Sequence, residues 1–139
     1  MSVLLLAPVV ALAVLGAVAA VLRVQRMGQR DLVGRVVESP SGTRRKPSIL
    51  YFTGATCTIC HTAQTPALSA LRSSVRGEVD IREIDIAASP DIARTYRVMS
   101  LPTTIVLDER GEIADINVGF ASVDKLLEQL EAIGVAVAA

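Results

Sequence analysis

The stretch Ile49-Leu50-Tyr51-Phe52-Thr53-Gly54-Ala55-Thr56-Cys57-Thr58-Ile59-Cys60 decides the fold of this chain of 139 residues. The mostly apolar and aromatic run 49–53 lies between Pro47 and Gly54, which predicts a short strand. A helix is expected to begin at the two cysteines and to end near Val75, because apolar residues then recur at helical spacing. The sequence therefore places a dithiol at the start of a helix that directly follows a strand.

Strands and helices continue to alternate after this unit. We expect a second strand at 79–86, a short helix from Ser89 to about Arg97, a third strand at 103–107, a fourth strand at 112–118 and a final helix capped by Ser122. The second strand changes its apolar alternation between Ile81 and Ile84, which suggests a bulge. The loop 108–111 fits a tight hairpin. The order βαβαββα predicts an α/β fold, with a mixed sheet and helices on both faces.

The amino-terminal part of the chain is almost purely apolar. No charged side chain occurs before Arg23, and the run from Val3 to Leu22 consists mainly of Val, Leu and Ala. About 20 apolar residues suffice to cross a bilayer as a helix. We therefore expect residues 1–24 to form a single transmembrane anchor. The alternative is a cleaved signal peptide with its small-residue site at 17–19, but a signal peptide has a basic start and a shorter apolar core.

Charge is distributed unevenly, although the formal net charge is zero. The segment from Arg23 to Lys46 holds seven of the 14 basic residues but only two of the 14 acidic ones. We interpret residues 25–46 as a basic linker and residues 47–139 as the soluble domain. Because Lys and Arg near a membrane span tend to stay in the cytoplasm, the domain is predicted to face the cytoplasm, with the opposite side as the alternative. No nucleic-acid partner is expected.

Two cysteines separated by two residues at a helix start suit disulfide exchange. The attacking group in such exchange is a thiolate, and a helix N-terminus lowers the pKa of a cysteine from its usual value of about 8.5. Cys57, nearer the helix start and more exposed, is the expected nucleophile, and Cys60 is the expected resolving thiol. The alternative, a purely stabilising disulfide, closes a loop too short to add much stability.

Residues 47–133 resemble a thioredoxin-fold thiol–disulfide oxidoreductase. The resemblance is carried by Cys57-Thr58-Ile59-Cys60 after a strand, Leu101-Pro102-Thr103 before the third strand, and Val118-Gly119 before the last helix. It implies a cis Pro102 that faces the dithiol. It also implies that Leu101, Pro102 and Gly119 bind an extended substrate segment, by a form of strand addition. An ordinary trans turn proline is the alternative at this position.

The resemblance implies an enzyme that reduces or exchanges disulfides in partner proteins and receives electrons from an unknown donor, and the expected anchor would hold this enzyme at the membrane. The dithiol itself carries the electrons, so no cofactor is expected. In the cytoplasm the net direction would be reduction, since that compartment keeps thiols reduced. The alternative from another class is a non-catalytic subunit of a membrane complex that uses the fold for interaction.

His61 introduces a rival interpretation. Cys57-Thr58-Ile59-Cys60-His61 also matches the attachment pattern of c-type haem. In that interpretation both cysteines bind the haem covalently and His61 is one axial ligand, with Met27 or Met99 as the opposite one. Haem domains of that kind are helical, whereas this domain alternates strands and helices. A zinc or other metal site is not expected, because no third cysteine or second histidine exists. Within the redox interpretation, His61 either favours the thiolate when protonated or is a solvated helix residue.

The chain departs from the thioredoxin pattern around the dithiol. Thr56 stands where the family has Trp, and Thr58-Ile59 replaces Gly-Pro. Tyr51 and Ile81 replace the buried Asp and the Lys of the family's proton-transfer pair. Pro66, which is expected to kink the helix or mark an early turn, lies six residues after the second cysteine, where the family has five. Because of the changes at positions 51 and 81, the proton-transfer pair of the family is absent.

Overall fold

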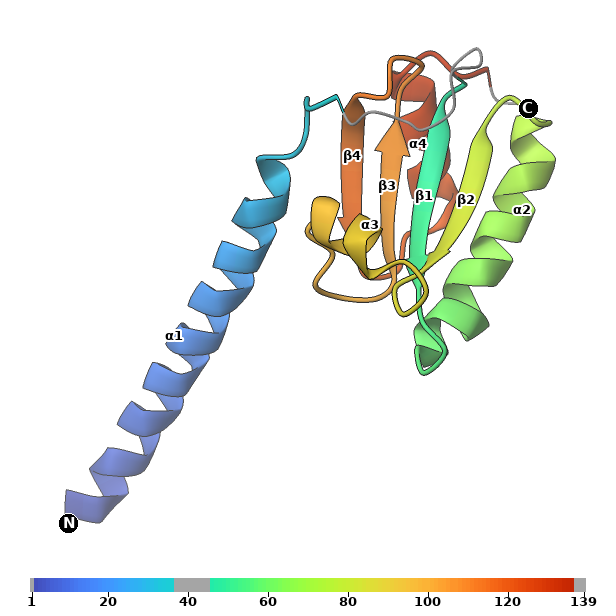
Figure 1. Ribbon diagram of the computed structural model, residues 1–139. Helices are drawn as coiled ribbons and strands as arrows, with labels where there is room; N and C mark the ends of the chain where they lie inside the picture. The colour runs from blue at the N-terminus through green and yellow to red at the C-terminus, as the bar shows by residue number, and fades with distance from the viewer. Residues whose placement is uncertain (1, 37–45, 137–139) are drawn as a thin grey trace.

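The computed structural model describes residues 2–36 and 46–136. Its elements follow the order α1 (Ser2–Arg30), β1 (Ser48–Thr53), η1 (Cys60–Gln64), α2 (Thr65–Val75), β2 (Asp80–Asp85), α3 (Pro90–Thr95), β3 (Thr103–Leu107), β4 (Ile113–Val118) and α4 (Val123–Ala132). The segment η1 is a π-helical turn that leads directly into α2. After α1, this order confirms the βαβαββα arrangement expected from the sequence (Figure 1).

The four strands form one mixed sheet in the order β2-β1-β3-β4. β1 and β2 are parallel, whereas β3 is antiparallel to both of its neighbours, β1 and β4. The pairing of β1 with β2 is regular along its whole length, so the bulge predicted in the second strand is wrong. Ile81 and Ile84 instead pack on opposite faces of a sheet that is covered on both sides. A register shift lies between Val106 and Leu107, where β3 pairs with β4.

Helices cover both faces of the sheet, as the sequence predicts. Successive side chains of a strand point to opposite faces, so the apolar residues 49–52 of β1 contribute alternately to two buried clusters. Tyr51 shares its cluster with Leu71 of α2 and Leu126 of α4. Phe52 packs on the other face against Tyr96, with ring centroids 5.8 Å apart. Figure 1 shows α3 in front of the sheet and α4 behind it.

The first helix is longer than the expected anchor, because it continues to Arg30. Within the described part of the chain, Ala7–Arg30 is the one helical stretch long and apolar enough to cross a membrane, and an 18-residue window within it has a mean hydropathy of 2.3. A signal sequence passes the same test, so the boundaries of anchor, linker and domain stay predictions. The middle of the expected linker, residues 37–45, lies outside the described residues.

The residues that follow α1 belong partly to the folded domain. Leu32 is buried and joins the cluster on the α3 face of the sheet. Val36 forms a single antiparallel bridge with Glu112 beside the start of β4. By sequence alone, Leu32-Val33 and Val36-Val37 fit either a short strand or a helix end. The structure shows a turn and one bridge, which attach the end of α1 to the edge of the sheet.

Candidate active site

Cys57 occupies the position just before the first turn of the helix. The helix begins at Thr58, and the N–H of Cys57 donates to the carbonyl oxygen of Gly54 at 3.0 Å. The carbonyl oxygen of Cys57 accepts a hydrogen bond from the N–H of His61 at 3.4 Å, and its Sγ accepts one from the N–H of Cys60 at 3.2 Å. The sulfur of Cys57 therefore accepts a hydrogen bond from a main-chain N–H of the first turn, where the helix dipole favours negative charge.

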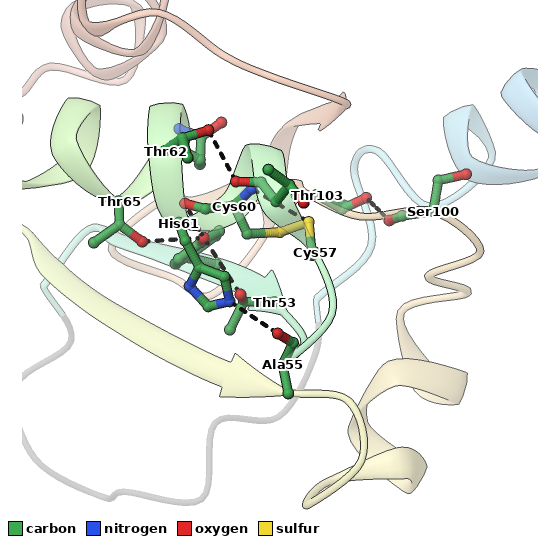
Figure 2. The surroundings of a disulfide bond; sticks show 12 residues. Thr53, Ala55, Cys57, Cys60, His61, Thr62, Thr65, Ser100 and Thr103 are labelled. Atoms are coloured by element: carbon green, nitrogen blue, oxygen red, sulfur yellow. Dashed lines mark hydrogen bonds between the residues drawn. A yellow bond between two sulfur atoms is a disulfide. The ribbon is translucent and has the colours of Figure 1, made fainter.

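Cys57 and Cys60 are joined by a disulfide, with their Cα atoms 5.3 Å apart (Figure 2). This separation lies within the usual range for bonded cysteines. Cys60 is fully buried, whereas Cys57 is half-buried and packs at the margin of the larger cluster. The difference in burial agrees with the expectation that Cys57 is the more exposed thiol. The assignment of nucleophile and resolving roles stays a prediction.

The loop before β3 lies against the turn that carries Cys57. Its Leu101–Pro102 peptide bond is cis, which confirms the expectation drawn from the resemblance. Leu101 approaches Gly54 so closely that a Cβ on this glycine would lie 3.0 Å from Leu101 Cδ1. A side chain at position 54 would therefore require the Leu101 side chain to move. Leu101 and Cys57 also pack against the same buried cluster, so the loop and the dithiol form one site.

Gly119 joins this site through its main chain. Its N–H donates to the carbonyl oxygen of Pro102 at 2.8 Å, and its φ of +88° lies in the left-handed region that favours glycine. The structure thus brings together Leu101, Pro102 and Gly119, the three residues predicted to bind substrate, beside the dithiol. Their role in binding stays a prediction.

Tyr51 lies beneath the helix start, at the position where the sequence departs from the buried Asp of the family. Its phenol donates a hydrogen bond to the carbonyl oxygen of Cys60 at 3.1 Å. The phenol oxygen also lies 3.4 Å from Thr53 Oγ1 and 3.3 Å from Thr65 Oγ1. The Cys60 carbonyl accepts in addition from the N–H of Thr65, five residues later, which makes the turn π-helical. From the sequence, Tyr51 was identified only as a replacement for the buried Asp of the family, and its hydrogen bond to the Cys60 carbonyl was not predicted.

A second polar contact missed by sequence reasoning links the helix to the Gly119 loop. Gln64 is fully buried in the π-helical turn. Its Nε2 donates to the carbonyl oxygen of Ala121 at 3.1 Å, and its Oε1 accepts from the N–H of Ala121 at 2.9 Å. A single Gln within a helix has no pattern that marks it in advance. The paired bonds hold the loop in front of α4 against the helix that carries the dithiol.

His61 is exposed, and its Nε2 lies 3.3 Å from the carbonyl oxygen of Ala55 (Figure 2). Its effect on the dithiol stays a prediction. Met27 and Met99, the suggested second ligands of a haem, are both largely exposed. Across residues 2–36 and 46–136, no three His, Cys, Asp or Glu side chains come together as a metal site would require.

A family model for thioredoxin matches residues 37–132, more than half of the chain. The chain belongs to the thioredoxin family. Among curated proteins, the thioredoxins of Staphylococcus aureus strains N315 and COL are 38% identical to it over 66 residues. These matches cover 48% of this chain and 62% of each relative, so the chain spans less than two thirds of the length of these thioredoxins.

Solved structures share the fold of this thioredoxin-family chain. A structure described as that of a malarial protein has a TM-score of 0.60 and 24% identity, and the match covers 65% of this chain and 99% of that one. A thioredoxin-2, described as a component of malaria parasite protein secretion machinery, has a TM-score of 0.62 and 22% identity, covering 70% and 99%. At these identities the likeness shows the fold alone, and it agrees with the fold predicted from the sequence.

Proposed function

We propose that this protein is a membrane-anchored thiol–disulfide oxidoreductase that reduces or exchanges disulfides in partner proteins. The observation that supports this most directly is the Cys57–Cys60 disulfide at a helix start, with the Leu101–Pro102 loop packed beside it. Membership of the thioredoxin family supports the same chemistry. The two thiols can hold both electrons of the exchange, so we propose no further cofactor.

In the reduced protein, the Cys57 thiolate would attack one sulfur of the partner's disulfide. A mixed disulfide forms, and the other partner sulfur leaves as a thiolate that takes up a proton. Cys60 then loses its proton and attacks the Sγ of Cys57, which releases the second partner sulfur as a thiol. The partner gains two electrons and two protons, while Cys57 and Cys60 become a disulfide that a separate dithiol donor must reduce again.

The partner segment is proposed to pair with the main chain of the loop before β3. The Pro102 carbonyl oxygen already accepts a hydrogen bond from the N–H of Gly119. The main chain of Leu101 is therefore the proposed pairing group. Ile59 lies between the cysteines and Phe120 follows Gly119, and both side chains are more than half exposed. They offer apolar contacts to the paired segment.

We propose a single-pass membrane protein with α1 as its anchor. The apolar helix Ala7–Arg30 supports this arrangement, and the basic residues that follow it favour a cytoplasmic domain. Labelling of Cys57 in intact cells with permeant and impermeant thiol reagents tests the orientation. A cytoplasmic domain predicts labelling by the permeant reagent alone, whereas labelling by both would place the domain outside.

The activity is tested by reduction of insulin disulfides with dithiothreitol as the electron source. The full chain in detergent is expected to accelerate the reaction, and Cys57→Ser is expected to reduce the rate to that of dithiothreitol alone. Ser73→Ala, an exposed change on α2, is the matched control and should leave the rate unchanged. A Cys57→Ser variant as active as the parent would remove the nucleophile assignment, whereas a parent chain that does not accelerate the reaction would favour a non-catalytic interaction subunit.

A further inference from the structure

Two side-chain interactions fasten the end of α1 to the domain. Gln29 Nε2 donates to the carbonyl oxygen of Arg97 at 2.9 Å, and an Nη of Arg97 donates to the carbonyl oxygen of Gly28 at 3.0 Å. Gln29 is 6% exposed, so the contact is closely packed. Arg97 lies between α3 and the Leu101–Pro102 loop. The end of α1 is therefore attached near the dithiol end of the sheet.

The residues after α1 then run along the sheet toward its opposite end. The N–H of Gly34 donates to the carbonyl oxygen of Ile113 at 2.8 Å, and the N–H of Ile113 donates to the carbonyl oxygen of Arg35 at 3.0 Å. Ile113 begins β4, and the other end of β4 pairs with the start of the strand that follows Pro102. The segment 28–35 thus passes from the dithiol end of the sheet to the far end.

Traced backward from Gly28, α1 leaves the domain on the side of the dithiol. Figure 1 shows α1 and the carboxyl end of β1, which leads to Cys57, directed toward the same side of the domain. Six residues separate Gly28 from Leu22, the last residue of the uncharged run, which is about 9 Å of helix at 1.5 Å per residue. The headgroup layer on each side of a bilayer is roughly 5 to 7 Å thick. A spanning α1 would therefore hold the dithiol end of the domain close to the headgroups.

Exposed apolar side chains occur in the segments around the dithiol. Ile59, between the cysteines, is 54% exposed, and Phe120, next to Gly119, is 52% exposed. Met99, in the loop that leads to Leu101, is 75% exposed. Apolar side chains of this kind are compatible with the membrane interface and with the apolar surface of a membrane-embedded protein.

We propose that the dithiol end of the domain lies against the membrane surface, and that its exchange partner is a membrane-embedded protein whose cysteine pair lies at the same surface. This inference rests on the proposed function, since it requires that α1 spans the bilayer and that the dithiol exchanges. The reaction is the balanced one given above: the partner's disulfide becomes two thiols as Cys57 and Cys60 become a disulfide. The same steps in reverse describe an electron donor at the same surface.

The orientation is tested with single tryptophans, because the chain contains no Trp of its own. Met99→Trp places the probe at the dithiol end, and Glu109→Trp, in the hairpin between β3 and β4, places the matched probe at the opposite end. Each full-length variant is reconstituted in vesicles of ordinary and of brominated phosphatidylcholine. We expect brominated lipid to quench the probe at position 99 severalfold more strongly than the probe at position 109.

Equal quenching at the two positions, or stronger quenching at position 109, would overturn the inference. Insulin reduction by the same vesicles separates this failure from failure of the proposed function. Stronger quenching at position 99 supports the inference. Equal quenching in vesicles that still reduce insulin would support the enzyme activity and contradict the orientation. A chain that does not float with the vesicles contradicts both the anchor and the inference.

The partner is tested with two transmembrane peptides that carry the same disulfide-bonded cysteine pair. In one peptide the pair directly follows the apolar segment, and in the other a helical spacer of the EAAAK type lifts it away from the membrane. With dithiothreitol as the electron source, each rate is compared with the rate without the protein. The full chain in the same vesicles should accelerate reduction of the surface pair severalfold more than reduction of the lifted pair. Equal rates, or faster reduction of the lifted pair, would overturn the assignment of a membrane-surface partner even where insulin is reduced normally.

Discussion

Gln64 and Ala121 exchange two hydrogen bonds across the candidate active site, although 57 residues separate them in the sequence. Both residues are fully buried. Gln64 lies in the turn that follows Cys60, and Ala121 ends the loop that contains Gly119. The bonds therefore hold two parts of the site in a fixed relation: the helix that carries the dithiol and the loop that contacts Pro102.

Replacement of Gln64 by Leu is expected to destabilise the fold. The change leaves the N–H and the carbonyl oxygen of Ala121 buried without partners, and each unsatisfied group of this kind costs about 1–3 kcal/mol. Urea unfolding followed by circular dichroism should show a lower free energy of unfolding. The exposed Ser73→Ala variant should unfold like the parent, and a Gln64→Leu variant as stable as Ser73→Ala would contradict this account.

Replacement of Tyr51 by Phe tests the phenol beneath the dithiol. The variant loses the hydrogen bond to the Cys60 carbonyl, which we expect to cost about 0.5–1.5 kcal/mol of unfolding free energy. Tyr96→Phe removes the same atom from another buried tyrosine and serves as the matched control at neutral pH. Equal stability of the two variants would show that the contact of Tyr51 with the π-helical turn contributes nothing.

Tyr96 gives the domain a specific response to alkaline pH. Burial raises the pKa of Tyr96 above its usual value of 10.0, and the positive charge of Arg82 offsets part of the rise. The unfolded chain therefore loses this proton at lower pH than the folded one. The stability contributed by the neutral phenol is complete below pH 10.0 and is lost as the pH rises through the raised pKa.

The measurement is the free energy of unfolding of the parent and of Tyr96→Phe, from neutral pH to above pH 10.0. The parent should lose stability more steeply with rising pH than the variant, since Phe has no proton to release. Identical slopes in the two proteins would show that Tyr96 does not titrate differently in the folded and unfolded chains.

The strand before Cys57 and the proline loop could be predicted because local sequence determines them. An apolar run followed by two cysteines defines a strand and a helix start, and Leu101-Pro102-Thr103 stands directly before an apolar strand. The helix start at Ser122 could also be predicted from the sequence. The structure confirms it, because Ser122 Oγ accepts a hydrogen bond from the N–H of Lys125 at 3.3 Å. These features depend on neighbouring residues and need no tertiary contact.

The π-helical turn, by contrast, depends on contacts between distant residues. The sequence showed only that Pro66 lies one residue later than in the family. In the structure a π-helical turn precedes Pro66, and a turn with i→i+5 bonds absorbs one extra residue. Tyr51 of β1 donates a hydrogen bond to this turn, and Gln64 within the turn bonds to Ala121, 57 residues later in the chain. The bulge wrongly assigned near Ile81 has a similar origin, because a strand covered on both faces does not show a simple alternation.

The most direct test of the central claim is to trap the mixed disulfide. Reduced Cys60→Ser and Cys57→Ser variants of the full chain are each incubated with a disulfide-bonded peptide, and the adducts are located by mass spectrometry. The account predicts a persistent peptide adduct on Cys57 in the Cys60→Ser variant, because the nucleophile attacks and no resolving thiol releases it. An adduct that forms only on Cys60 in the Cys57→Ser variant would contradict the account.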